Sequence, residues 1–427
     1  MRVIADGAWG FASSGLLTKS EIERVSAAAV DTARASATLK KADVELVSEE
    51  PHVDIWRTPF AKDPFNVPLE TKIDLLLRIN AEMMKVKDIK VTNSRMDFMR
   101  ELQFFASNEG SFIEQDILRS GTGYSATAVG EGDMQIRSFP DSHGGGFACK
   151  GYEMIEEMPL LENAQRTAEE ASALLRAPEC PEMKADLILG GSQLALQIHE
   201  SIGHPTELDR VLGSEADYAG TSFVTIDKLG KFHYASPIVN IVADSTVPHG
   251  LATIGYDDEG VEAQRWYIIE NGVFAGYLTS RETAPAIGEK RSRGAMRAHG
   301  WGRIPLIRMT NMSLMPGEWT LDDLVADTKH GVYMDTNRSW SIDQKRLNFQ
   351  FGTEMAWEIK NGKKTRMLRN AVYQGMTPEF WNSCDAICNS AHFVLWGLAN
   401  CGKGQPGQTA EMSHGAAPAR FRNVKIL

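Results

Sequence analysis

The sequence predicts an α+β protein in two parts: an N-terminal α/β domain over residues 1–177 and a β-rich, mostly antiparallel domain over residues 183–427. Three observations carry this prediction. The 427 residues exceed the ~100–200 residues of a usual single domain. Helical and extended patterns alternate in the first half, whereas short strands and turns dominate the second. Between the halves, Pro178 and Pro181 mark a boundary, because proline disfavours helix in the residue before it.

The first domain is predicted to contain three helices and a hairpin. Thr18 and Glu21 form a capping box before a helix that runs toward Lys40, a second helix follows Pro68, and a third spans about residues 163–176. The apolar stripes are Ile22, Val25 and Ala29 in the first helix and Ile73, Leu76, Ile79 and Met83 in the second. The hairpin joins two alternating runs, Met96–Ala106 and Ser111–Leu118, through Asn108-Glu109-Gly110.

The second domain is predicted to begin with a buried strand, Asp186–Leu189, which turns at Gly190-Gly191 into a short apolar helix. Hairpins follow. Their strongest signals are Asn271-Gly272 between Trp266–Glu270 and Val273–Leu278, and Asn361-Gly362 between Met355–Ile359 and Lys364–Leu368. A further short strand is predicted at Ile238–Ala243.

Composition argues against nucleic-acid and membrane binding. The 56 acidic and 45 basic residues give a formal net charge of −11, which repels a phosphate backbone unless cations gather on one face. We find no Lys/Arg-rich run, no signal-peptide pattern, and no apolar run of the ~20 residues that a membrane helix needs. Five cysteines are sparse and odd in number for a secreted disulfide framework. We expect a soluble, cytoplasmic protein.

The clearest functional signal is Ile198-His199-Glu200-Ser201-Ile202-Gly203-His204-Pro205. A hydrolytic zinc site needs neutral imidazole ligands, an open position for water, and a carboxylate outside the ligand set that accepts a proton. His199 and His204 are therefore candidate metal ligands, and Glu200 is the candidate general base. The alternative is a coincidental pair of histidines near a helix end. The adjacent glutamate and the apolar flank favour the metal interpretation.

The spacing of the two histidines requires an irregular helix. Residues four apart lie about 40° apart around a helix axis, but residues five apart lie roughly 140° apart. Gly203 and Pro205 can end the helix there, so that His204 reaches the metal from a loop. A bulge within the helix would have the same effect.

A catalytic zinc site usually has a third protein ligand. Glu207, Asp209, another histidine and Cys401 are all candidates. Cys401 lies in the glycine-containing segment Asn400-Cys401-Gly402-Lys403-Gly404, and such a loop with a neighbouring lysine exposes a thiol and favours the thiolate. Cys384 and Cys388 lie in an apolar segment and are predicted to be buried, inert thiols.

Several segments together resemble the TldD/PmbA family of metallopeptidases, also described as modulators of DNA gyrase. They are the HExxxH segment with Gly203–Glu207, Tyr256–Val261 with Ala263–Arg265, Gly276–Leu278 with Ser280–Ala284, Arg308–Asn311 with Pro316-Gly317, and Cys401–Gln405. The resemblance spans nearly the whole chain and is densest after Asp186. The terminal loop departs from the family pattern at Gly404 and over Met412–Ala419.

The resemblance implies a function for particular positions. His199, His204 and Cys401 match the metal ligands, Glu200 matches the catalytic glutamate, and the expected cofactor is Zn²⁺ held in the β-rich domain. It places the chain in the TldD-like, metal-bearing branch. It also implies a homodimer, or a heterodimer with a PmbA-like subunit, that acts on unfolded peptides. The chain is expected to begin after the family's first strand and helix.

We therefore expect Glu200 to accept a proton from a zinc-activated water and to pass it to the leaving amine of an extended peptide. Arg293, Arg297 and His299 lie in a glycine-punctuated basic segment and are candidates for substrate and oxyanion binding, although such a segment can also be a solvated loop. Two other functions remain open. One is a non-catalytic binding or regulatory protein, whose structural metal would take a fourth ligand such as Glu207 or Asp209. The other is a hydrolase of small modified amides.

Overall fold

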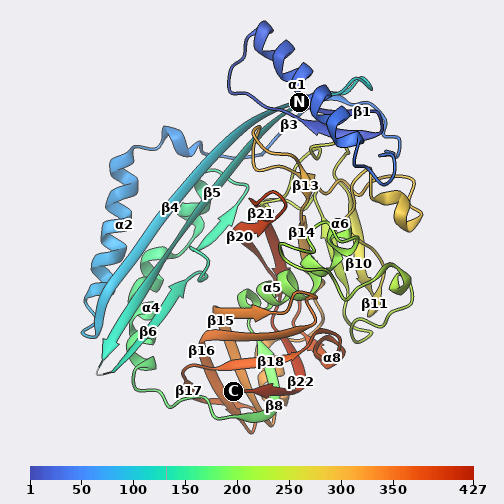
Figure 1. Cartoon of the computed structure of the whole chain (residues 1–427). Coiled ribbons are helices and arrows are strands. Elements are labelled where there is room, and N and C mark those ends of the chain that lie inside the picture. Colours follow the sequence, from blue (N-terminus) through green and yellow to red (C-terminus); the bar gives the residue numbers. More distant parts are fainter. Residues whose placement is uncertain (131) are drawn as a thin grey trace.

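The computed structural model describes residues 1–130 and 132–427, and it has the α+β architecture that the sequence predicts. Helices and strands alternate before residue 177, and strands predominate after it (Figure 1). The helices are α1 (Lys19–Ala37), α2 (Leu69–Met84), α3 (Glu153–Glu157), α4 (Leu160–Leu174), α5 (Gly191–Ile198), α6 (Leu208–Val211), α7 (Leu321–Asp327) and α8 (Thr377–Asn382). None of these described helices has the length and apolar character that crossing a membrane requires.

A five-stranded sheet with two very long strands dominates the N-terminal part (Figure 1). The strands of this part are β1 (Arg2–Ala5), β2 (Ala8–Phe11), β3 (Val53–Arg57), β4 (Ile89–Ala106), β5 (Phe112–Gly130), β6 (Asp133–Phe139) and β7 (Gly146–Ala148). β5 pairs with β3, β4, β6 and β7, and the predicted turn at residues 108–110 joins β4 to β5. β1 and β2 form a separate hairpin that packs against α1.

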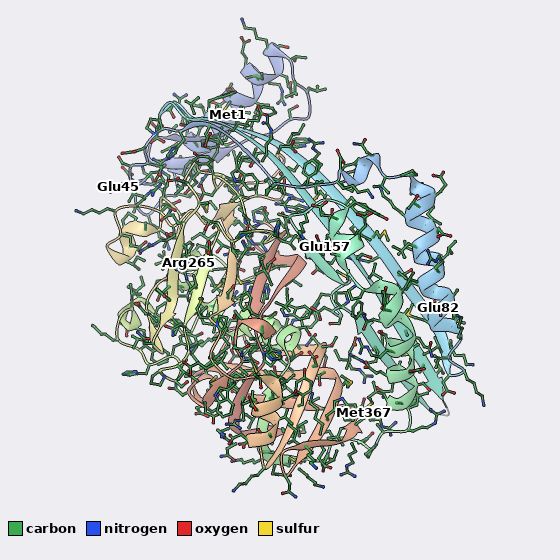
Figure 2. All side chains as sticks on the ribbon, turned by 180° about the vertical axis from the view of Figure 1, so that it is seen from behind. Met1, Glu45, Glu82, Glu157, Arg265 and Met367 are labelled. Carbon is green, nitrogen blue, oxygen red and sulfur yellow. The ribbon has the colours of Figure 1, made fainter. Side chains whose placement is uncertain are left out.

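Two helices cover the long strands. α2 packs on β4, α4 packs on β5 and β6, and the helices contact each other, so both lie on one face of the sheet. Ile79, Met83, Tyr124 and Ala168 belong to the core beneath them. Seen from behind, Glu82 on α2 and Arg265 on β10 mark opposite sides of the molecule (Figure 2).

The C-terminal part contains two larger sheets. Their strands are β8 (Met183–Leu189), β9 (Ile241–Asp244), β10 (Arg265–Glu270), β11 (Val273–Phe274), β14 (Asn311–Leu314), β15 (His330–Ile342), β16 (Asn348–Lys360), β17 (Lys363–Leu368), β18 (Val372–Met376), β19 (Cys384–Ile387), β20 (Val394–Lys403), β21 (Gln408–Ala416) and β22 (Ala419–Ile426). The six-stranded sheet has the order β11-β10-β9-β14-β21-β20, and the seven-stranded sheet has the order β15-β8-β22-β18-β16-β17, with β19 paired to β22. A short pair, β12 (Met296–Arg297) and β13 (Leu306–Ile307), stands apart. Most pairings are antiparallel; β14–β21 and β15–β8 are parallel.

The helix that carries the HExxxH segment lies between these two sheets. α5 follows β8 and contacts β15 of one sheet and β14, β20 and β21 of the other. Leu194, Ile198 and Ile202 are buried in the largest hydrophobic core of the molecule. The HExxxH segment is therefore fixed by packing of its helix against both sheets.

Several sequence expectations need correction. In α2, Ile73 of the predicted apolar stripe is 45% exposed, and only Ile79 and Met83 are buried. α1 begins after its Thr18 cap as predicted, but Ile22 is 52% exposed, and the buried stripe is Val25, Ala29 and Ala33. The small hairpin reaches the helix at Ala29 and Ala33, where only glycine at position 10 leaves room for their backbone and side chains.

The strand predicted at Val273–Leu278 ends at Phe274. Its Asn271-Gly272 turn has the expected positive φ angles, but the chain then turns toward the HExxxH region. There the backbone N–H of Leu278 donates to the carbonyl of Thr206, and the N–H of Leu208 donates to the carbonyl of Leu278. The residues after Phe274 thus help to fix the segment that contains Glu207.

Candidate metal centre

The segment that holds His199 and His204 is a π-helical turn. α5 continues into η2 (His199–Gly203), whose closing hydrogen bond runs from the backbone N–H of His204 to the carbonyl of His199. This i→i+5 bond inserts one residue into the helical turn. The two imidazoles consequently lie on the same side of the helix, with ring centroids 4.8 Å apart. The spacing of the two histidines allows two arrangements, and the structure has the helix bulge.

The other arrangement, an unwound turn at Gly203, is wrong. Gly203 has helical angles (φ −60°, ψ −68°), and residues 204–206 continue as the 3₁₀ turn η3 (His204–Thr206). A Cβ at position 203 would overlap Sδ of Met309, so any larger residue there requires the Met309 side chain to move. Glycine there allows close packing under the site, not a change of backbone direction.

Cys401 joins the two histidines from a strand, whereas the sequence suggested an open loop. It lies near the end of β20, opposite Ala410 of β21, and it is buried. Its Sγ lies 3.6 Å from Nε2 of His204. Among the described residues, His199, His204 and Cys401 form a group whose potential ligand atoms all lie within 4.8 Å of one another.

The cation beside Cys401 is Arg308, and not Lys403 as the sequence suggested. Burial raises the pKa of the Cys401 thiol to about 11, and Arg308 opposes this rise. The guanidinium of Arg308 also donates to the carbonyl of Cys401 over 2.5 Å. Lys403 follows two positions later on the same strand, but its Nζ is directed to Asp209, 2.8 Å from Oδ1.

Glu207 and Asp209, the alternative ligands, are engaged elsewhere. Oε2 of Glu207 lies 2.9 Å from Nδ1 of His204 and accepts its proton in a hydrogen bond. Oε1 of Glu207 lies 3.3 Å from Nζ of Lys403. These contacts leave Nε2 of His204 for a metal, and a carboxylate behind a ligating histidine is a recurrent support in metal sites.

His199 has a support that the sequence analysis did not single out. Its Nδ1 lies 2.8 Å from Nε2 of His414 on β21, so Nε2 is the nitrogen left for a metal. The sequence allowed another histidine near the site without identifying it. The only signal was position, since His414 lies on the strand that pairs with the strand of Cys401.

Glu200 is buried next to the group and is bonded to Arg346. Nη1 of Arg346 donates to Oε2 of Glu200. Burial raises the pKa of Glu200, and Arg346 lowers it. Arg346 lies in the turn between β15 and β16 with a positive φ of 63°, and no sequence pattern indicated it.

The three residues of the predicted basic segment have other contacts. Arg293 is paired with Glu289 over 2.6 Å, and the guanidinium of Arg297 donates to the carbonyls of Met309 and Glu411. His299 lies 3.3 Å from Oγ1 of Thr409. No recorded hydrogen bond or ion pair of these described residues reaches the HExxxH segment or Cys401, so a role in oxyanion binding stays a prediction.

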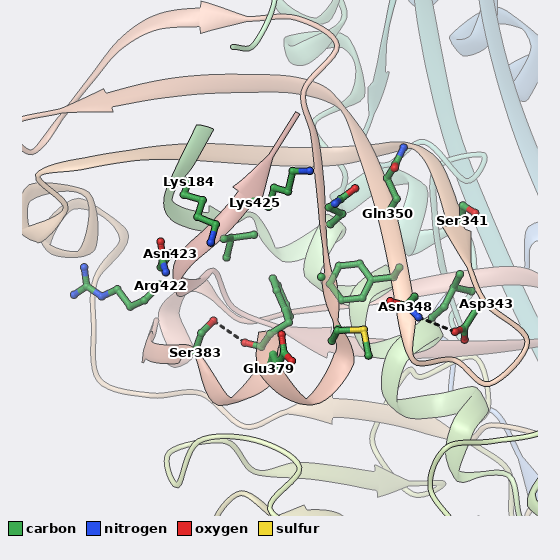
Figure 3. A pocket seen from close by; sticks show the side chains of 17 residues that line it. Lys184, Ser341, Asp343, Asn348, Gln350, Glu379, Ser383, Arg422, Asn423 and Lys425 are labelled. Atoms are coloured by element: carbon green, nitrogen blue, oxygen red, sulfur yellow. Dashed lines mark hydrogen bonds between the residues drawn. The ribbon is translucent and has the colours of Figure 1, made fainter. Parts of the chain in front are cut away.

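Cys384, Cys388 and a large cavity lie outside the group. Cys384 and Cys388 are buried, free thiols, as expected. A cavity of about 670 Å³ opens over the seven-stranded sheet, where Lys184 and Lys425 stand on neighbouring strands (Figure 3). It includes no candidate ligand and is therefore separate from this site.

Comparison with known proteins identifies the two parts of the chain. Residues 62–177 match the PmbA/TldA metallopeptidase central domain, and residues 182–426 match the PmbA/TldA metallopeptidase C-terminal domain. A metalloprotease of Methanocaldococcus jannaschii is 31% identical over 422 residues, which cover 98% of this chain and 88% of that protein. A protein of Saccharolobus solfataricus named zinc metalloprotease TldD homolog is 26% identical over 56% of this chain and 51% of its own length.

The fold is also known from crystals. The structure of a proposed modulator of a DNA gyrase from Thermotoga maritima superposes with a TM-score of 0.75 at 17% identity, covering all of this chain and 88% of that one. The matched domains together span most of the sequence and include the π-helical turn and Cys401. The chain belongs to the PmbA/TldA metallopeptidase family.

Proposed function

We propose that this chain is a zinc-dependent peptidase that hydrolyses unfolded or extended peptides, with His199, His204 and Cys401 as ligands and Glu200 as general base. The observation that carries the proposal is the convergence of the three ligand atoms within 4.8 Å of one another. Glu200 is adjacent in sequence to the first of them but engages Arg346. Glu200 is therefore not one of the three proposed ligands, and it remains available for proton transfer.

The donor set fits zinc. Two imidazole nitrogens and one thiolate are a ligand set that zinc accepts, and three protein ligands leave the fourth position open. Burial lowers the pKa of His199 and His204 well below the ordinary value, which keeps both rings in the neutral form that binds metal. Coordination would deprotonate the Cys401 thiol despite its raised pKa. A zinc ion held there supplies a Lewis acid that polarises a carbonyl group and acidifies water.

The protein side chains divide the remaining work. Glu207 and His414 hold the two imidazoles in fixed orientation through their Nδ1 atoms. Glu200 accepts the proton of the attacking water and delivers it to the amine that leaves. Arg346 holds one oxygen of Glu200, so the other oxygen is the one that exchanges the proton.

The non-catalytic alternative receives less support. A structural zinc site is closed by four protein ligands. Glu207 contacts His204 and Lys403, and Asp209 contacts Lys403, so both carboxylates considered as a fourth ligand have other partners.

The proposal is tested by zinc content and peptide hydrolysis on the full chain. We expect about one zinc per chain in the wild type and a large loss in Cys401→Ser, whereas Cys388→Ser, which removes a buried thiol outside the group, retains the metal. Glu200→Gln should retain zinc and lose hydrolysis of a denatured protein substrate. If Cys401→Ser kept its full zinc content, Cys401 would not be a zinc ligand. A zinc-loaded wild type that cleaves no peptide would overturn the peptidase function.

A further inference from the structure

A second cavity lies beside the metal centre and contains an unpaired buried carboxylate. It has a volume of about 380 Å³, within the range of small-molecule and side-chain sites, and it lies between β4–β6 of the five-stranded sheet and the β15–β16 hairpin. The segment Asp141–Gly144, between β6 and β7, forms part of its wall. Trp340 adds aromatic surface, whereas the ring of Tyr124 lies on the other face of β5, in the core beneath α2 and α4.

Asp141 is the carboxylate in question. Only 8% of the residue is exposed, and its one recorded hydrogen bond is from the backbone N–H of Ser142, over 2.7 Å. Asp141 forms no ion pair with another described residue; burial raises its pKa, and His143 and Arg137 oppose this rise. The other carboxylate of the cavity, Glu354, is in contrast saturated by Arg137 and by the N–H and hydroxyl of Ser138. Burying a carboxylate without a counter-ion is unfavourable. Within the described chain, the fold provides no counter-ion for Asp141, so a bound cationic group could supply one.

The two arginines that line the cavity have other partners. Arg95 is paired with Asp97 over 2.9 Å and lies over the ring of Phe147. Arg338 donates to the side-chain oxygens of Gln135 and Asn370. A positively charged group that enters from outside can therefore reach Asp141 without displacing an internal ion pair.

The cavity also adjoins the metal ligands. Asp141 and His143 line both this cavity and a small space of about 10 Å³, roughly the room that one water molecule requires, and His199 and His414 line that same space. A group bound at Asp141 is therefore separated from the imidazole of His199 by this one small space. A subsite there would lie outside the group of candidate ligands and adjoin it.

We propose that this cavity is the subsite for a lysine or arginine side chain of the peptide substrate, and that Asp141 is the residue that selects it. The inference rests on the proposed peptidase function. The aliphatic part of a long cationic side chain would lie against Trp340, while its charged end reaches the carboxylate. No covalent step is added, because the contact acts only through binding of the substrate.

The test compares matched peptides on the zinc-loaded protein. Cleavage sites in a denatured protein digest are first mapped by mass spectrometry. Peptides are then synthesised with lysine, norleucine or glutamate at the position that the digest identifies. We expect kcat/KM for the lysine peptide to exceed that for norleucine by about tenfold or more, as a hydrogen bond between charged groups provides. In Asp141→Asn this preference should fall to less than about twofold. The fall should come from a lower kcat/KM for the lysine peptide, with kcat/KM for the norleucine peptide unchanged.

Two controls separate the possible results. Asp74→Asn, at an exposed carboxylate of α2 that pairs with Arg78 and does not line the cavity, should leave the preference unchanged. Unaltered zinc content and circular dichroism in Asp141→Asn exclude a folding defect. Equal cleavage of all three peptides, a preference for glutamate, or a lysine preference that persists in Asp141→Asn would overturn the subsite and leave the peptidase function intact. Failure of the wild type on every peptide would instead overturn the proposed function.

Discussion

The two histidines of the metal centre are supported in opposite ways. On one side, His204 contacts the carboxylate of Glu207, which is completely buried and lies near the ammonium of Lys403. On the other side, His199 contacts His414, and burial lowers the pKa of His414 to about 4, which keeps it neutral. One side is a network of charges, and the other is a pair of neutral rings.

In the proposed zinc site, this difference sets how charge is distributed around the thiolate of Cys401. A carboxylate behind an imidazole raises its basicity as a ligand, whereas a neutral acceptor mainly fixes the tautomer and the ring orientation. A second carboxylate behind His199 would add negative charge to a site that already has a thiolate, Glu200 and Glu207. The neutral pair avoids that addition and still fixes the ring.

The largest effect is expected from Lys403→Met, which tests the charged network on the side of His204. Burial lowers the pKa of Lys403, but Asp209, Glu207 and Glu215 outweigh burial and raise it. Removing this ammonium leaves three carboxylates buried without their shared cation, and we expect a loss of about 3–5 kcal/mol in the free energy of unfolding. Urea unfolding of the metal-free protein measures it. Lys425→Met, at a half-exposed lysine, should change the unfolding midpoint little; equal midpoints for the two variants would contradict the charged-network interpretation.

The next effect compares the two supports directly. Replacing a residue behind a metal-ligating histidine usually weakens metal affinity by ~10–100-fold. We expect Glu207→Gln to lie near the upper end, because it removes a charge, and His414→Phe near the lower end, because it removes a neutral acceptor. Zinc competition with a chromogenic chelator gives both dissociation constants. Equal losses, or a larger loss in His414→Phe, would show that the charge of Glu207 contributes nothing to binding.

A buried ion pair away from the site sharpens the comparison through pH. Burial raises the pKa of Glu354 to about 7, and Arg137 opposes this rise. The folded state therefore binds a proton more tightly than the unfolded chain, whose glutamates titrate near 4.3, so stability should decrease as pH rises from about 4 to about 7. In Glu354→Gln the free energy of unfolding should change less across this pH window, by on the order of 2 kcal/mol. Denaturant midpoints measured at constant ionic strength test this, and parallel pH profiles would count against it.

Sequence reasoning identified the parts of the site that depend on local spacing. The HExxxH segment and the need for an irregular helix follow from His199 and His204 alone, and the Asn-Gly turns have the positive φ that their residues favour. The choice of a π-helical turn over an unwound one was not predictable. Nor was the contact of Gly203 with Met309, which is far away in sequence.

The supports of the ligands were harder to predict for the same reason. His414 and Arg346 approach the site only because β21 pairs with β20 and because β15 and β16 form a hairpin beneath it. Glu207 was visible in the sequence, but as a candidate ligand. Its actual partner follows from the contact with Nδ1 of His204, which no residue spacing specifies.

The smallest expected effect tests whether charge outside the network matters at all. Arg293 was a candidate for oxyanion binding, yet its guanidinium pairs with Glu289 and it lies in no recorded contact with the site. We expect Arg293→Ala to change kcat/KM by less than about twofold, because a half-exposed ion pair contributes little. Arg346→Met is the matched variant: it removes the cation that holds Glu200, and it should lower kcat more than it raises KM. If Arg293→Ala instead lowered kcat as much as Arg346→Met does, the basic segment would have to move toward the substrate during the reaction, and the charges that count would not be confined to the side of His204.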